Sequence, residues 1–159
     1  MDKTQYSSMI RVNREFTLAV LLTKNTPAFL AGCAAPVGGR KELYETFLEC
    51  CIREFGEEAG RKTAAEEWHK YAICEGPGWE MHCYFSVADS LDDCVTCTDE
   101  PVHILSIRDV LYAAATPAGQ GGIRAFPRDS SEVAPDLAAL LGLVLQAQRR
   151  RSLARIQYA

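Results

Sequence analysis

Residues Gly39 to Arg61 read GRKELYETFLECCIREFGEEAGR, and this stretch contains the most regular pattern of the chain. The part from Leu43 to Ala59 contains no proline, its apolar residues recur at helical spacing, and Gly60 provides a stop, so we predict a helix there. At about 100° per residue, six apolar side chains form one stripe that must face the protein core. The stripe consists of Phe47, Leu48, Cys51, Ile52, Phe55 and Ala59.

Three glutamates, Glu54, Glu57 and Glu58, fall together on a strip beside that apolar face. Their mutual repulsion is unfavourable, and the helix C-terminus adds to the cost because its dipole disfavours negative charge. A divalent cation would offset this cost, and oxygen ligands alone select hard ions such as Mg²⁺ or Mn²⁺. Two helical pairs are also predicted, because Glu49 stands four residues before Arg53, which stands four before Glu57.

The segment from Pro36 to Gly39 ends an apolar run and is predicted to turn tightly. Glycine permits a positive φ and a close approach of the backbone to a ligand. We therefore expect a carbonyl group of this turn to be available as a metal ligand, and its N–H groups to face a phosphate oxygen.

The whole stretch resembles the signature of the Nudix superfamily. That signature is a Gly, five residues, a Glu, seven residues, and then Arg-Glu-apolar-any-Glu-Glu-any-Gly-apolar. Only the last position departs from it, because Arg61 stands where an aliphatic residue is usual, which concerns the packing after the helix rather than the carboxylates. A Glu-Glu-x-Gly segment alone is typical of a solvated helix face, but the full spacing favours the Nudix interpretation. The matching residues are Gly39, Glu45, Arg53, Glu54, Phe55, Glu57, Glu58 and Gly60.

The resemblance implies an α/β/α sandwich, with a mixed sheet between helices, that covers nearly all of the chain. It also implies a hydrolase that cleaves a pyrophosphate linkage in a nucleoside diphosphate joined to another group. The implied cofactor is Mg²⁺, with Mn²⁺ as a substitute. Carried over residue by residue, the metal ligands are Glu54, Glu57 and Glu58, joined by the carbonyl of Gly39.

The resemblance also assigns supporting roles and candidate bases. Arg53 would orient a glutamate, and Glu45 would pair with Arg53 to brace the loop and the helix. Attack of water on phosphorus needs a carboxylate that accepts a proton, and Glu54 is one candidate. A glutamate on a loop before a late strand often supplies another base or ligand, and Glu100 stands where that residue is expected. A solvated acidic loop is the competing interpretation of Glu100, and Glu80 is a weaker alternative base.

Substrate contacts are expected outside the signature, since loops carry specificity. Trp79 can stack on a base or ribose, or simply pack. Arg124 and Phe126, in a glycine-rich loop, are expected to close over a substrate. Pro77 is similar in placement to a proline of Nudix enzymes that act on ADP-ribose, although a proline between two glycines is more often part of a hairpin turn.

Other motifs carry weaker signals. Cys94 and Cys97 form a lone Cys-x-x-Cys, which is a weak indication of zinc without a second pair. The basic run Arg149 to Arg151 suits the end of a helix, and we favour that interpretation over RNA binding.

The rest of the chain alternates strands and helices, so the fold class is α/β or α+β. With 159 residues, and no repeat or linker, residues 1–159 are expected to form one domain. The predicted strands are Glu15–Leu22, Ala28–Ala35, Trp68–Glu75, Glu80–Val87 and His103–Ile107. The other predicted helices are Thr63–Glu67, Ile107–Ala114 and Ala134–Arg151, and the loops are Ser90–Glu100 and Thr116–Ser131.

The composition of the chain limits the classes of partner that we expect. The net charge of −4 argues against nucleic acid as a main partner, which leaves a small nucleotide as the expected one. The N-terminus lacks the apolar core of a signal peptide, and no apolar run is long enough to span a bilayer. We therefore expect a cytoplasmic protein without membrane contact, whose seven cysteines are reduced. The resemblance leaves a homodimer as a candidate oligomeric state.

These observations favour a pyrophosphohydrolase acting on a (d)NTP, because the chain is short and shows no extra N-terminal domain. A pyrophosphatase for ADP-ribose or a nucleotide sugar is the alternative. A Nudix-like module that binds a nucleotide without catalysis is the alternative of another class, which the intact glutamates disfavour.

Overall fold

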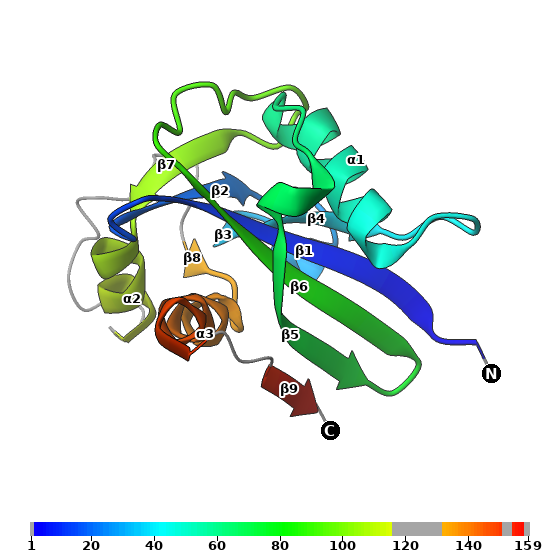
Figure 1. Cartoon of the computed structure of the whole chain (residues 1–159). Helices are drawn as coiled ribbons and strands as arrows, with labels where there is room; N and C mark the ends of the chain where they lie inside the picture. The colour runs from blue at the N-terminus through cyan, green and yellow to red at the C-terminus, as the bar shows by residue number, and fades with distance from the viewer. Residues whose placement is uncertain (1, 116–131, 151–153, 158–159) are drawn as a thin grey trace.

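The structure is a computed structural model that describes residues 2–115, 132–150 and 154–157 (Figure 1). Within them the chain forms a mixed sheet in the order β8-β3-β2-β1-β6-β5-β9, with β4 paired to β1 and β7 paired to β2. The strands are β1 (Thr4–Asn13), β2 (Leu18–Thr23), β3 (Cys33–Ala35), β4 (Val37–Arg40), β5 (His69–Gly76), β6 (Trp79–Ala88), β7 (Val102–Ser106), β8 (Glu132–Val133) and β9 (Ala154–Gln157). The helices are α1 (Phe47–Ala59), α2 (Ile107–Ala115) and α3 (Leu137–Arg150), with the short 3₁₀ helices η1 (Ala28–Leu30) and η2 (Ala65–Glu67).

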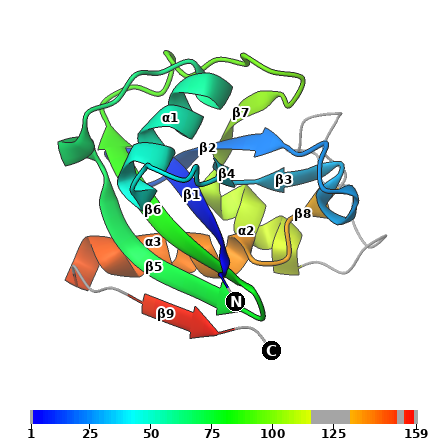
Figure 2. The same cartoon turned by 90° about the vertical axis from the view of Figure 1, so that its right-hand side faces the viewer.

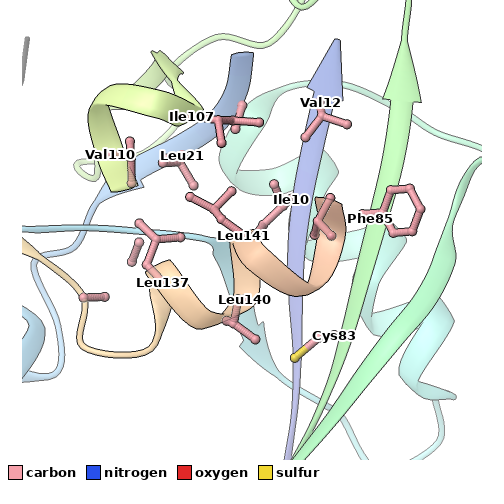
Figure 3. Close-up of a cluster of buried hydrophobic side chains, with 14 of the residues drawn as sticks. Ile10, Val12, Leu21, Cys83, Phe85, Ile107, Val110, Leu137, Leu140 and Leu141 are labelled. Carbon is pink, nitrogen blue, oxygen red and sulfur yellow. The ribbon is translucent and has the colours of Figure 1, made fainter. Parts of the chain in front are cut away.

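Helices cover both faces of the sheet, as predicted: α1 lies on one face, and α2 and α3 lie on the other (Figures 1 and 2). Successive side chains of a strand point to opposite faces, so β1 contributes to two cores. Met9 packs in the core beneath α1, whereas Ile10 and Val12 pack in the core beneath α3. Figure 3 shows Ile10 and Val12 on the same side of the sheet as Leu141 of α3.

The centre of the sheet is β1, which the sequence analysis did not predict as a strand. It pairs antiparallel with β2 and β4 and parallel with β6, and the register places Ser7 opposite Gly39. Ser7, Ser8 and Arg11 are buried in this strand, and these polar side chains hide its apolar pattern. The strand matters for the site because it supports β4, which leads into α1.

The helix α1 begins at Phe47, not at Leu43 as predicted. Thr46 caps it, since its side chain accepts a hydrogen bond from the Glu49 backbone N–H while the Glu49 side chain accepts one from the Thr46 N–H. This capping box leaves residues 41–46 outside the helix. The predicted end is confirmed: Gly60 adopts a left-handed conformation, with φ of 69°.

The apolar stripe of α1 is confirmed at its centre. Cys51, Phe55 and Ala59 are fully buried, and Phe55 packs edge-on against Trp68. Burying a side chain such as Phe55 contributes about 1.5–3 kcal/mol to stability. This packing holds α1 on the sheet and fixes the direction of its glutamates.

Other predicted elements differ at their ends. The segment Ala28–Ala35 starts as η1, so only Cys33–Ala35 is a strand. The predicted helix from Ala134 starts at Leu137 instead, because Ala134 bonds to Ala34 beside the short strand β8. The hairpin of β5 and β6 is confirmed, with its turn at Pro77 and Gly78. None of the helices within the described ranges is both long and apolar enough to cross a membrane.

Candidate active site

Two glycines let β4 approach its neighbours closely. A Cβ atom on Gly38 would lie 2.5 Å from the carbonyl oxygen of Ser7 in β1. A Cβ atom on Gly39 would overlap the carboxyl group of Glu54. The Glu54 carboxyl group therefore lies directly over the backbone of Gly39, in space that only glycine leaves open.

Arg53 is the centre of a network of carboxylates. Its Nε donates to Glu45 Oε2 at 3.0 Å and its Nη2 to Glu45 Oε1 at 2.6 Å, a bidentate pair. Its Nη1 donates to Glu54 Oε1 at 2.7 Å and to Glu57 Oε2 at 3.2 Å. The expected contacts of Arg53 with Glu45 and Glu57 are thus confirmed, and Arg53 joins the loop to the helix.

The predicted pair of Glu49 and Arg53 is wrong. Glu49 Oε2 instead accepts a hydrogen bond from the N–H of Thr46 at 2.7 Å. A carboxylate at the start of a helix satisfies an otherwise unpaired N–H group and interacts well with the dipole, so capping outcompetes the ion pair.

The bidentate pair has a marked electrostatic effect. Hydrogen bonds from the Arg53 guanidinium lower the pKa of Glu45 from 4.5 to about 2, and the same bonds raise the pKa of Arg53. The backbone N–H of Glu42 also donates to Glu45 Oε1, at 2.7 Å. Glu45 therefore stays ionised, and it holds residues 42–45 against the helix.

We predict that the Glu45→Gln variant loses about 2 kcal/mol of unfolding free energy at pH 7, because hydrogen bonds to a charged group are strong. Because the pKa is lowered on folding, the contribution of Glu45 is present above pH 4.5 and is lost as the pH falls from there towards 2. Urea unfolding at pH 7 and pH 3 tests this. The difference between wild type and variant should shrink at pH 3, and an equal difference at both values would contradict the prediction.

A second group of charges lies at the end of α1. Glu58 Oε2 accepts a hydrogen bond from the Gly38 N–H at 3.1 Å, and Glu58 Oε1 lies 3.7 Å from the Lys24 ammonium. Lys24 Nζ also donates to Glu100 Oε2 at 2.7 Å. The structure thus brings Glu100, predicted from the sequence, next to Glu58 through a shared lysine.

Burial governs the state of Glu58. Desolvation raises the pKa of Glu58, and Lys24 and the Gly38 hydrogen bond act in the opposite direction. Positive charge close to a buried carboxylate favours its ionised form. A cation beside Glu58 therefore stabilises the arrangement.

The residues present fit a hard divalent cation in their chemistry. Arg53 pairs with Glu45, Glu54 and Glu57, and Lys24 pairs with Glu58 and Glu100. The positions beside these carboxylates therefore favour positive charge. The donors are all carboxylate oxygens, which suit Mg²⁺ or Mn²⁺. In the described part of the chain, no three acidic, His or Cys side chains converge as metal ligands. The Gly39 carbonyl faces the Cys50 thiol, with Sγ at 3.8 Å.

The remaining predicted residues lie elsewhere. Glu80 Oε1 is 2.7 Å from His82 Nε2, in a local pair on β6. Trp79 packs over Gly76 and against the core beneath α3. Arg124 and Phe126 lie outside the described residues.

The departure at Arg61 has a local explanation. Its guanidinium Nε lies 3.1 Å from Asp93 Oδ2, so the loop after β6 supplies a charged partner where the family signature has an apolar residue. The two cysteines of the Cys-x-x-Cys motif differ in environment, because Cys94 is buried in the core beneath α1 and Cys97 is exposed.

A cavity of about 440 Å³ lies beside the signature. Its lining consists of Arg40, Lys41, Glu42, Leu43, Arg53 and Glu54. A larger cavity, of about 580 Å³, is lined by residues such as Phe16, His69, Phe85 and Gln148, and includes none of the signature carboxylates. The smaller cavity combines three cationic side chains, Arg40, Lys41 and Arg53, with Glu54, so it is the candidate place for a phosphate group.

Lys24 stands in a segment predicted only as a turn, so its place between Glu58 and Glu100 was not predicted. Lys24 follows β2 directly, and its backbone pairs with Gly32 and Cys33. A charged residue directly after a buried strand is a signal for such a role, but its acidic partners are far away in sequence. The contact of Cys50 with the Gly39 carbonyl was not predicted either, and burial raises the pKa of the Cys50 thiol to about 11.

The fold of this chain is similar to the folds of several solved Nudix proteins. The Nudix domain of NrtR from Shewanella oneidensis, solved with ADP ribose, has a TM-score of 0.70 at 12% identity, over 93% of this chain and 90% of that chain. The MutT protein from Bacillus halodurans has a TM-score of 0.66 at 17% identity, over 98% of this chain and 90% of that chain. A bifunctional NMN adenylyltransferase/ADP ribose pyrophosphatase from Francisella tularensis, solved with AMP and an Mn ion, has a TM-score of 0.65 at 15% identity, over 91% of this chain and 41% of that chain.

No protein-family model matches this sequence, and no curated protein matches it significantly. The structural likeness is therefore far stronger than the sequence likeness. The Gly39–Arg61 signature falls on β4, on the loop that follows it and on α1. The chain has the fold of the Nudix hydrolases.

Proposed function

We propose that this protein is a divalent-metal-dependent Nudix hydrolase that cleaves a pyrophosphate linkage in a nucleoside diphosphate joined to another group. One observation carries the proposal: the Glu54 carboxyl group lies over Gly39, held by Arg53, in the fold of the Nudix hydrolases. Three carboxylates, Glu45, Glu54 and Glu57, share the single positive charge of Arg53, so a bound cation would offset their mutual repulsion.

Glu54, Glu57 and Glu58 are the residues that would hold Mg²⁺ or Mn²⁺, together with the Gly39 carbonyl. When bound, the ion would neutralise phosphate oxygens and lower the pKa of the attacking water. Arg53 would keep the carboxylates of Glu54 and Glu57 oriented, since it donates a hydrogen bond to each of them.

Glu54 is the stronger candidate for the base, because its carboxyl group lines the cavity beside Arg40 and Lys41. Glu100 is the alternative. Its side chain is only 8% exposed, and both of its oxygens accept hydrogen bonds from the segment Lys24–Thr26. This favours a role for Glu100 as a ligand or positioning group.

For the substrate, we propose a (d)NTP that releases pyrophosphate. ADP-ribose or a nucleotide sugar is the second candidate, favoured by the likeness to a Nudix domain solved with ADP ribose and to an ADP ribose pyrophosphatase. Arg40 and Lys41 would contact phosphate oxygens. Trp79, Arg124 and Phe126 stay proposed substrate contacts, and a cytoplasmic location and a homodimer stay predictions.

The deciding experiment is a panel of nucleoside triphosphates, ADP-ribose and nucleotide sugars, with phosphate and pyrophosphate release measured in Mg²⁺ and in EDTA. We expect turnover only with metal, and a loss of about 100-fold in the Glu57→Gln variant. Glu66→Gln, which changes an exposed glutamate of η2, is the matched control and should behave as wild type. The compounds of the panel that release phosphate or pyrophosphate identify the substrate class.

The outcomes separate the alternatives. Folded protein without metal-dependent turnover on any panel member would overturn the enzyme proposal. Nucleotide binding by calorimetry without turnover would instead favour the non-catalytic module.

A further inference from the structure

Lys24 is held firmly at the end of β2. Its N–H donates to the Cys33 carbonyl at 2.9 Å, and its own carbonyl accepts from the Gly32 N–H at 2.8 Å. Its side chain is 14% exposed and points to two carboxylates, with Nζ 2.7 Å from Glu100 Oε2 and 3.7 Å from Glu58 Oε1. A single ammonium group therefore lies between two acidic side chains.

Each of these carboxylates has a second anchor that does not involve Lys24. Glu58 Oε2 accepts from the Gly38 N–H. Glu100 Oε1 accepts from the N–H groups of Asn25 at 2.7 Å and Thr26 at 3.3 Å. The oxygens that face Lys24 are thus the other two, Glu58 Oε1 and Glu100 Oε2, and backbone bonds hold both groups in place without the ammonium.

The charges at this point do not balance. Two carboxylates with side-chain exposures of 14% and 8% share one lysine, whose ammonium carries a single positive charge. Removing an ion pair's partner from a buried carboxylate leaves an uncompensated charge. Whatever replaces the ammonium must therefore be a cation, and a divalent ion would match the two negative charges.

We propose that Lys24 is a tethered cation that competes with the divalent ion for Glu58 Oε1 and Glu100 Oε2, and thereby limits the metal affinity of the site. The inference rests on the proposed metal site. A lysine suits this role, since its ammonium is a compact point charge on a flexible stem that can withdraw when another cation enters.

The test is Mn²⁺ binding, measured from the electron paramagnetic resonance signal of free Mn²⁺ at constant pH and ionic strength. In Lys24→Met and Lys24→Gln, we expect the Kd for Mn²⁺ to fall by about tenfold, because a competing unit charge at this distance is removed. Lys24→Gln keeps a hydrogen-bond donor for Glu100, so Kd can still be measured on this variant if Lys24→Met does not fold. Lys3→Met is the matched control: it removes a lysine paired with Glu75 at 2.9 Å, and should leave the Kd unchanged.

A second readout is thermal unfolding. In EDTA both Lys24 variants should have a lower Tm than wild type, and their Tm should rise more on addition of Mn²⁺. A substitution that disrupted the geometry of the site would weaken Mn²⁺ binding. Tighter Mn²⁺ binding by the Lys24 variants therefore distinguishes loss of a competing charge from disruption of the site. An unchanged or higher Kd in folded variants, with wild type binding Mn²⁺, overturns the role of Lys24 alone. Absence of Mn²⁺ binding by every form of the protein overturns the metal site as well.

Discussion

Replacing Glu58 by Gln is expected to lower kcat/KM on the hydrolysed nucleotide on the order of 1000-fold, without loss of the fold. The amide oxygen of Gln can still accept the hydrogen bond from Gly38, but it carries no charge for a metal ion. Because burial raises the pKa of Glu58, its ionised form is costly in the folded protein. The unfolding free energy of the metal-free variant should therefore equal or exceed that of wild type.

Three measurements check this expectation: kcat/KM with saturating Mg²⁺, Tm in EDTA, and the rise in Tm on adding Mg²⁺. Wild type should gain stability with Mg²⁺, and Glu58→Gln should gain much less. Glu66→Gln again serves as the control for removal of an acidic charge. Activity of Glu58→Gln within tenfold of wild type would show that this carboxylate is not a metal ligand.

The two neighbouring glycines are expected to respond in opposite ways to the same substitution. In Gly38→Ala the new methyl group meets backbone atoms, the Ser7 carbonyl oxygen at 2.5 Å and the Ser8 Cα at 3.1 Å. Backbone in the middle of a sheet moves little, so we expect a loss of about 3 kcal/mol in unfolding free energy. In Gly39→Ala the methyl group meets only the flexible end of the Glu54 side chain among its nearest atoms, which can move aside.

Gly39→Ala should therefore fold almost as well as wild type but lose about 100-fold in kcat/KM, because a displacement of about 1 Å at a reacting group has that effect. Urea unfolding and steady-state kinetics on both variants test the contrast. Equal activity of Gly39→Ala and wild type would mean that the position of the Glu54 carboxyl group is unimportant for turnover. A fully stable Gly38→Ala would contradict the close approach of β4 and β1.

Local contacts were predictable where both partners lie on one helix or in adjacent turns. The spacing of Arg53 and Glu57 predicted their contact, and the periodicity of α1 predicted the burial of Cys51, Phe55 and Ala59. The prediction failed for Glu49, because two local interactions were available to it and the capping of Thr46 was overlooked. Residues 43–46 were assigned to the helix for the same reason.

Contacts between distant parts of the chain were not predictable in this way. Lys24, Glu58 and Glu100 meet only because the fold places the end of β2, helix α1 and the segment before β7 together. Gly39 and Glu54 approach each other because β1 supports β4 under the helix. The strand β1 itself escaped notice, since its buried serines and arginine break the apolar pattern.

The amino-acid sequence alone was enough to predict the helix that carries the glutamates, its end at Gly60 and the spacing of the Gly39–Arg61 signature. These properties depend on local periodicity and on the chemistry of residues a few positions apart, which a single chain displays directly. The pairing of Lys24 with Glu58 and Glu100, in contrast, depends on the tertiary structure, because the lysine and the two glutamates lie far apart in the sequence. Charges interact through space, so the partners of Lys24 are set by the packing of α1 and of the segment before β7 against the end of β2.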